Sequence, residues 1–235
     1  MRTTTSSRAW WAISRWLLIG WLASLALAPA YANTKVDVVF GITLEPNTLD
    51  PTTAPAAAIG EVVHYNVLEG LVKIEENGET TPLLAASWQA SADERQYTFR
   101  LRPGVRFHDG QPLDAAAVRF SFERAKAPNS GNKSRSKLFD NIERIETPDL
   151  FTVVLTLRHR DPHLLYRLGE SPAVILHPAS VAQASSAPVG TGPFRLERWD
   201  KGHSITLVKW AGYRNADAVQ LQRAVFRFVN TFVDD

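Results

Sequence analysis

The chain contains few residues whose types and spacing could support catalysis. His108 and Asp109 are adjacent, and an imidazole beside a carboxylate is a candidate acid/base pair. In a strand, however, neighbouring side chains point to opposite faces, and Asp109-Gly110 is a common turn sequence. We therefore interpret the pair as part of a turn, and we retain an enzyme that uses His108 and Asp109 as an alternative.

Two other histidines have the spacing of a metal site. His159 and His163 are four residues apart, the interval at which a helix presents two imidazoles to zinc. Pro162 lies between them, and no glutamate follows His159 as it would in a zinc peptidase. The chain has no cysteine, which excludes disulfides, thiolate metal sites and a cysteine nucleophile. We predict no metal and no cofactor.

A glycine-rich stretch, Gly190-Thr191-Gly192-Pro193, invites comparison with a phosphate-binding loop. It lacks the Gly-Lys-Ser/Thr ending of such loops, and Pro193 removes a backbone donor that a phosphate would need. The sequence also has no Gly-x-Ser-x-Gly motif, so it offers no nucleophile motif of the kind that many serine hydrolases use. We interpret the stretch as a structural turn and predict that the chain is not an enzyme.

The charge distribution separates the first 32 residues from the rest. Three of the 26 basic residues (Arg2, Arg8 and Arg15) and none of the 24 acidic ones lie there, so 23 basic residues remain in the body. The body therefore carries a net charge close to zero and no basic stripe. This balance argues against nucleic acid as a partner.

Residues 1–32 have the features of a signal peptide. An arginine-containing start precedes the uncharged apolar run Trp16–Ala28, and Ala30-Tyr31-Ala32 offers small residues for cleavage after Ala32. The alternative is an uncleaved membrane anchor, which needs about 20 apolar residues. Because the sequence has no cysteine, we expect no lipid-modified cysteine as an anchor. We expect a periplasmic protein that is not a lipoprotein.

The elements that would position these residues alternate between strands and helices. We predict a strand over 36–42, a helix over 56–68, a strand over 71–74 that turns at Asn77-Gly78, and a short helical turn over 81–88. A strand over 96–101 follows, then a helix that Asp114 caps and that runs to Lys126. Further strands are predicted over 142–145, 152–157, 173–176, 194–199, 204–210 and 224–229. The fold class is mixed α/β.

Four stretches, in this order and spacing, resemble the family 5 extracellular solute-binding proteins, which serve importers of peptides and nickel. They are Leu84–Trp88 with the strand Tyr97–Arg102, then Gly104–Leu113, Phe120–Arg124 and Val189–Phe194. Asn47–Pro51 and Leu68–Val72 support them. The resemblance covers about residues 36–235.

The resemblance implies the first lobe of a periplasmic-binding-protein-like clamshell (class II) over 33–235, with an inserted subdomain over roughly 75–185. Members of the family are about twice as long, so we expect this to be the N-terminal portion only, with the second lobe absent. The implied ligand contacts are Thr52, Thr53 and Ala54, together with Phe139 in the inserted subdomain.

The implied function is the binding component of an ABC importer, which captures a small solute, most simply a short peptide, and delivers it to a membrane permease. We expect a monomer, with no nucleic acid partner. Specificity would reside mainly in the second lobe, so this chain by itself is expected to bind weakly. Two alternatives stay open: a truncated interaction or scaffold domain without a transport role, and an exported hydrolase.

Overall fold

The computed structural model describes residues 36–54, 56–132 and 134–229. The strands are β1 (Val36–Ile42), β2 (Val72–Ile74), β3 (Thr80–Pro82), β4 (Ala85–Ala90), β5 (Gln96–Leu101), β6 (Ile142–Asp149), β7 (Thr152–Leu157), β8 (Phe194–Asp200), β9 (Ser204–Lys209) and β10 (Leu221–Phe228). The α-helices are α1 (Ala57–Val63), α2 (Ala115–Lys126) and α3 (Leu164–Leu168), and the 3-10 helices are η1 (Phe139–Asn141), η2 (Ser171–Ala173), η3 (Pro178–Gln183) and η4 (Ala216–Ala218). Within the described ranges, no helix combines the length and apolarity needed to cross a membrane.

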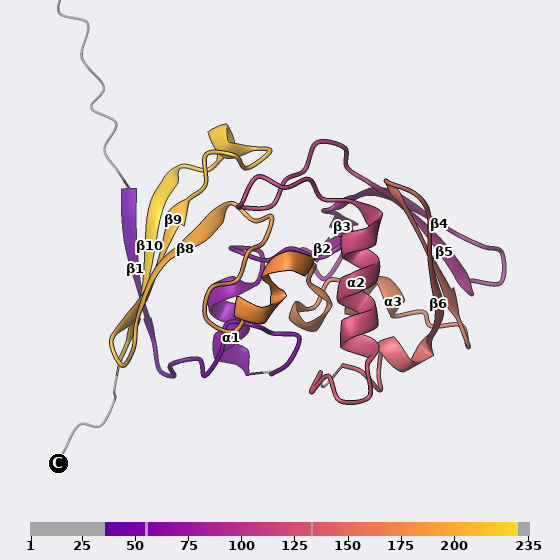
Figure 1. The fold of residues 1–235 in the computed structure, drawn as a ribbon, viewed down its shortest axis with the longest axis horizontal. Coiled ribbons are helices and arrows are strands. Elements are labelled where there is room, and N and C mark those ends of the chain that lie inside the picture. Colours follow the sequence, from indigo (N-terminus) through magenta and orange to yellow (C-terminus); the bar gives the residue numbers. More distant parts are fainter. Residues whose placement is uncertain (1–35, 55, 133, 230–235) are drawn as a thin grey trace, which may run out of the picture. The chain divides into compact units, whose positions relative to one another are not determined.

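The strands form two four-stranded sheets and one two-stranded ribbon (Figure 1). The first sheet has the order β1-β10-β9-β8, in which β1 runs parallel to β10 and the other pairs are antiparallel. The second sheet, β4-β5-β7-β6, is antiparallel throughout, and α2 packs against it. The mixed α/β class predicted from the sequence is confirmed.

Two apolar cores lie beneath these sheets. One, here called the α2 core, joins inward side chains of the β4–β7 sheet, such as Phe99 and Val153, to the apolar face of α2. The other, called the α1 core, joins the inward face of the first sheet (β1-β10-β9-β8) to α1. The segment Val67–Val72 supplies Val67 and Leu68 to the α1 core and the fully buried Leu71 and Val72 to the α2 core.

Local signals placed the central elements correctly. Asp114 caps α2, because its carboxylate accepts a hydrogen bond of 2.9 Å from the Ala117 amide. The Asn77-Gly78 turn closes the β2–β3 ribbon, with Gly78 at a φ of +84° that favours glycine. The strand pair predicted over 142–145 and 152–157 is present as β6 and β7.

The helix predicted over 56–68 is shorter than expected. It ends at Val63, because His64 is extended and Tyr65 takes a φ of +60°, outside the helical region. The Tyr65 hydroxyl fixes this turn by donating to the Gly169 carbonyl oxygen over 2.7 Å and accepting from the Ile74 amide over 2.9 Å. Distant contacts thus end a helix that the apolar spacing would have continued.

Two other predictions were wrong. Residues 81–88 are not a helical turn, because the Ala85 amide donates to the Leu71 carbonyl oxygen and β4 pairs with β5. Residues 173–176 are buried but not a strand. Their side chains alternate between the two cores, as strand residues would, but the Ile175 and Leu176 amides donate to the Glu69 carbonyl and the Ser121 hydroxyl instead of a neighbouring strand.

Candidate functional site

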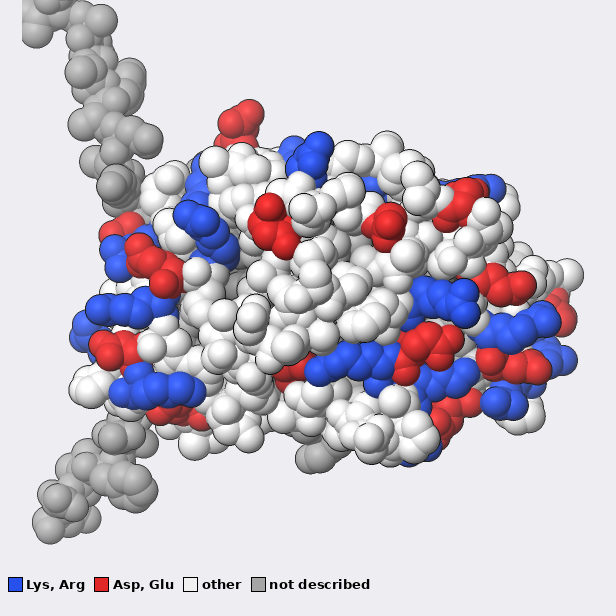
Figure 2. Space-filling model, viewed as in Figure 1, with Lys and Arg blue, Asp and Glu red and all other residues white. Residues whose placement is uncertain are grey.

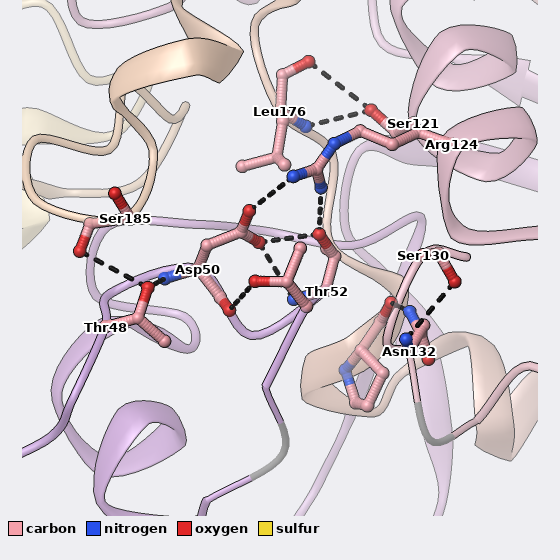
Figure 3. A network of polar contacts seen from close by, with 11 residues as sticks. Thr48, Asp50, Thr52, Ser121, Arg124, Ser130, Asn132, Leu176 and Ser185 are labelled. Carbon is pink, nitrogen blue, oxygen red and sulfur yellow. Dashed lines mark hydrogen bonds and ion pairs between the residues drawn. The ribbon is translucent and has the colours of Figure 1, made fainter. Parts of the chain in front are cut away.

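The loop that follows β1 is fixed by a buried carboxylate. Asp50 is 2% exposed, and its Oδ1 accepts hydrogen bonds from the Thr52 amide (2.9 Å) and the Thr52 hydroxyl (2.6 Å). Its Oδ2 accepts from Nη2 of Arg124 over 2.7 Å, and Nη1 of Arg124 donates to the Thr52 hydroxyl (Figure 3). Because Arg124 belongs to α2, this network joins the loop to the second sheet and its helix.

Neighbouring contacts hold both sides of the same loop (Figure 3). The Leu49 amide and the Thr48 hydroxyl both donate to the Ser185 carbonyl oxygen, over 2.8 and 3.3 Å. Ser121, one turn before Arg124 on α2, accepts from the Leu176 amide over 3.0 Å. The residues that follow in the loop, Thr53 and Ala54, are therefore attached to a segment that these hydrogen bonds fix.

The predicted ligand contacts differ in how accessible they are. Thr52 is 1% exposed and is occupied by Asp50 and Arg124, whereas Thr53 is exposed and Ala54 is half-buried. Phe139 is fully buried and packs edge-to-face on Phe122 in the α2 core. In this structure, therefore, Thr53 and Ala54 are the predicted contacts that present surface, while Thr52 supports them from below.

A second loop approaches this surface closely. A Cβ atom at Gly131 would lie only 2.8 Å from the Thr53 carbonyl oxygen, and Gly131 has a φ of +72°. Asn132, next to it, is buried and donates to the Pro172 carbonyl oxygen over 3.1 Å. Glycine at 131 is thus required both by its backbone angle and by this approach.

Asp50→Asn is expected to lower the free energy of unfolding by about 2 kcal/mol, because it removes one charge of a buried ion pair and leaves Arg124 partly uncompensated. Urea unfolding of the full chain measures this change. Asp200→Asn is the matched control, since Asp200 is exposed and its partner Arg198 lies 3.9 Å away; we expect about 0.5 kcal/mol or less. Equal effects of the two substitutions would contradict the role given to Asp50.

A second buried carboxylate fixes the glycine-rich turn. Glu69, 1% exposed, accepts two hydrogen bonds of 2.8 and 2.7 Å from the guanidinium of Arg214 and one of 2.8 Å from the Thr191 hydroxyl. The Tyr213 hydroxyl donates to it over 3.3 Å. Burial, and then the Glu69 charge, raise the pKa of Tyr213 to about 12, so the hydroxyl remains a donor.

His108 is a structural part of the same turn. Its Nδ1 accepts from the Gly190 amide over 3.3 Å, and its Nε2 lies 3.0 Å from the Gly192 carbonyl oxygen, to which it donates in the neutral form. Burial lowers the pKa of His108 to about 4. Asp109 faces away, with its carboxylate 3.0 Å from Nδ1 of His177. Because both ring nitrogens bind backbone, the geometry opposes a hydrolase built on His108 and Asp109.

The other candidate residues are the two histidines that have the spacing of a metal site. His159 and His163 are exposed residues of the connection between β7 and α3. Across the described ranges, no three metal-ligating side chains gather as a metal site would require.

The two histidines with lowered pKa values predict loss of stability in mild acid. Burial lowers the pKa of both His64 and His108 to about 4, whereas the unfolded chain takes up these protons near pH 6.5. The unfolded state therefore binds more protons between these values, and stability falls as the pH decreases from about 6.5 to 4, by at most about 3 kcal/mol per histidine.

Urea unfolding between about pH 7 and pH 5 measures this slope. His108→Gln should reduce the slope, whereas His159→Gln, at an exposed position, should leave it unchanged. A slope that neither substitution alters would contradict the prediction for His108.

An apolar hollow of about 420 Å³ lies beside β1. It is lined mainly by inward residues of the first sheet, including Phe40, which stacks on Phe226 at 5.3 Å between ring centroids. Val39, Phe40 and Leu44 are also notably exposed, at 56, 44 and 69%. An exposed apolar surface is what the interaction-domain alternative requires.

Sequence reasoning missed the charged residues that organise both networks. Arg124 and Glu69 lie within the motifs Phe120–Arg124 and Leu68–Val72, yet their types gave no indication of burial. The signal available for Glu69 was its place as the one charged residue of Leu68–Val72, whereas Phe120–Arg124 holds two charged residues, of which Glu123 is exposed. Arg214, the partner of Glu69, is 145 residues away in sequence, and only the fold brings the two together.

Comparison with known proteins supports one family. Residues 79–232 match the family model described as bacterial extracellular solute-binding proteins, family 5 middle. The chain is 32% identical over 218 residues to the glutathione-binding protein GsiB of Pectobacterium atrosepticum, covering 91% of this chain and 42% of that protein. The GsiB of Escherichia coli is 29% identical over 220 residues, with 92% and 43% covered.

Solved structures agree with this assignment. The PBP AgaA from A. tumefaciens in complex with agropinic acid superposes with a TM-score of 0.77 at 34% identity, over 82% of this chain and 40% of that one. The ABC transporter-associated periplasmic binding protein DppA from Helicobacter pylori, in complex with the peptide STSA, gives 0.74 at 27% identity, over 82% and 42%. The periplasmic-binding-protein-like fold is confirmed, and the chain spans about 40% of the length of these relatives.

Proposed function

The chain belongs to the bacterial extracellular solute-binding proteins of family 5, and on this premise we propose that it supplies one solute-contacting wall of a receptor that serves an ABC importer. Relatives in this family are binding proteins, which confirms the prediction that the chain is not an enzyme. No bond of the solute would be broken. The receptor would capture the solute by non-covalent contacts and present it to a permease.

The observation that carries the proposal is the buried Asp50–Arg124 pair beneath an exposed loop. A binding surface benefits from being fixed before the ligand arrives, because less conformational entropy is then lost on binding. Here the 2.7 Å ion pair holds the Thr52 side chain, and Thr53 and Ala54 follow it at or near the surface.

We propose a short peptide or a peptide-like molecule such as glutathione as the solute. The support is the uncharged pair Thr53 and Ala54 at the surface, and relatives that are named for binding glutathione or that hold a peptide. Phe139 would contribute only if its ring left the α2 core, where it is fully buried.

We further propose the periplasm as the location, a cleavable leader over 1–32, a lobe over 33–235 with its inserted subdomain over roughly 75–185, and a monomeric state. The leader lies outside the described residues. The second sheet supports an inserted subdomain within these bounds, since β4 to β7 all lie between residues 85 and 157. N-terminal sequencing of the exported protein would test the predicted cleavage after Ala32.

Thermal unfolding of the full chain with reduced glutathione or a di- and tripeptide mixture tests solute capture. A ligand that binds only the native state must stabilise it, and at roughly ten times its Kd the rise in Tm should be about 3 °C for a protein of this size. Thr53→Arg should abolish the rise. Thr43→Arg, at another exposed threonine, should leave it intact. A rise that survives Thr53→Arg would place the solute elsewhere, and no rise with either ligand would count against the proposed solute class.

A further inference from the structure

Beyond solute capture at the Asp50 loop, the structure holds a charged hollow at the C-terminal end of α2. Its volume is about 540 Å³, within the range of small-molecule sites. Figure 2 shows basic and acidic side chains gathered where β6 and the lower end of α2 lie in Figure 1. The charged residues that line the hollow are Glu123, Lys126, Arg135, Asp140 and Arg158.

Two of the cations are held in place by backbone oxygens. Nζ of Lys126 donates to the Glu143 carbonyl oxygen over 3.2 Å, and Nε of Arg158 donates to the Asp140 carbonyl oxygen over 3.1 Å. These bonds fix the side chains and leave their other donors available. Within the part of the chain that the structure describes, neither cation has a carboxylate at ion-pair distance.

The two acidic residues of the hollow differ in whether a basic side chain lies at ion-pair distance. Asp140 lies 3.3 Å from Nε of Arg135, so these two charges offset each other. Glu123 has no basic partner at ion-pair distance among the described residues. The hollow thus presents two positive charges, on Lys126 and Arg158, and one negative charge, on Glu123, without counter-charges in the described protein.

This pattern indicates a ligand that carries both signs of charge. The carbonyl end of α2 adds a partial negative charge of about one half, which lowers the sum of these uncompensated charges to about +0.5. A multiply charged anion such as phosphate would gain little from such a site and would face Glu123. A carboxylate beside an ammonium group matches it, because the carboxylate can bind Arg158 and Lys126 while the ammonium binds Glu123.

We propose that the hollow at the end of α2 binds an α-amino-acid zwitterion, that is, a carboxylate and an ammonium group on neighbouring atoms. Two sources share this chemistry: a free amino acid, and the amino-acid end of a larger solute such as glutathione. Pro128 and Arg135 line the hollow, and Gly131, which approaches Thr53, lies between them in the sequence. We expect the end of the larger solute to be the source.

Three matched probes test the charge pattern: L-alanine, propionate, which lacks the ammonium group, and ethylamine, which lacks the carboxylate. Backbone amide shifts of the full chain are followed in 1H–15N NMR titrations at constant ionic strength. L-alanine should bind most tightly, with saturable shifts around Lys126 and Arg158. Arg158→Gln should weaken both L-alanine and propionate about tenfold, the loss expected for one charge-assisted contact.

Glu123→Gln separates this proposal from general attraction of anions. It should weaken L-alanine about tenfold and leave propionate unchanged or bound more tightly. Both residues are exposed, so the variants should fold, and Arg198→Gln on β8 is the control for loss of a surface charge. The proposal is overturned if L-alanine binds no better than propionate, or if the two variants behave like Arg198→Gln.

A competition experiment then distinguishes the two sources. If glutathione displaces L-alanine from the shifts around Lys126 and Arg158, the site takes the end of the larger solute, as expected. If both are bound together, the site takes free amino acids and lies apart from the solute surface, which overturns the assignment of the source. Binding of L-alanine without any binding of glutathione or peptides would sustain the zwitterion site while counting against the proposed solute.

Discussion

Replacing Glu69 by alanine is expected to lower the free energy of unfolding by about 4 kcal/mol, the range for removing one partner of a buried ion pair. Glu69 accepts from Arg214, Thr191 and Tyr213, and its side chain is 2% exposed. Without it, the guanidinium of Arg214, 18% exposed, is left in the interior without its carboxylate. Urea unfolding of the full chain gives the measurement.

The exposed pair of Glu197 and Arg223 provides the control. Its N···O distance of 2.7 Å equals that of the Glu69 pair, but its side chains are 40 and 41% exposed, so Glu197→Ala should cost less than about 1 kcal/mol. A double variant, Glu69→Leu with Arg214→Met, should recover part of the loss, because it removes both charges together. If Glu69→Ala lowers the free energy of unfolding no more than Glu197→Ala does, the burial of the Glu69 pair does not increase its contribution to stability.

Gly190→Ala is expected to cost about 3 kcal/mol or more, since no rotation of the new side chain can relieve the clash. A Cβ atom there would lie 1.9 Å from the Val67 carbonyl oxygen. That carbonyl accepts from the Gly192 amide over 3.1 Å, and the Val67 side chain is fully buried, so the segment cannot withdraw without losing other contacts. The measured quantity is again the free energy of unfolding.

Gly60→Ala is the matched control for this substitution. Gly60 lies within α1, and a Cβ atom there would meet only the Ser171 side chain, at 3.6 and 3.8 Å, which are ordinary contacts. Alanine is a better helix former than glycine, so this change should stabilise the fold by about 0.5 to 1 kcal/mol. Two glycine-to-alanine substitutions should therefore act in opposite directions, and a harmless Gly190→Ala would show that the turn can move.

The acid-sensitive His108 is one of the groups that hold the same turn in place. His108 binds the backbone on both sides of Thr191, and Thr191 donates to Glu69, so the turn is held from two directions. It lies next to the Asn66–Val67 backbone, whose carbonyls accept from the Phe194 and Gly192 amides. A motif that could be mistaken for a phosphate loop thus joins the segment between the two cores to the start of β8.

The sequence by itself determined the elements whose signals are local. The cap at Asp114, the turn at Asn77-Gly78 and the alternation over Gln96–Leu101 depend on neighbours within a few residues, and each predicted the observed structure. The order and spacing of four motifs also identified the family, because such motifs record the packing of a whole fold in short stretches of chain.

Only the tertiary structure decided which charged residues are buried and where helices stop. Asp50 and Arg124 are 74 residues apart and Glu69 and Arg214 are 145 apart, so no local pattern relates them. The end of α1 depends on Tyr65 reaching Gly169, and residues 173–176 alternate between two cores without pairing as a strand. The physical reason is the same in each case: the free energy of these contacts comes from desolvation and pairing between distant segments, which a sequence pattern does not encode.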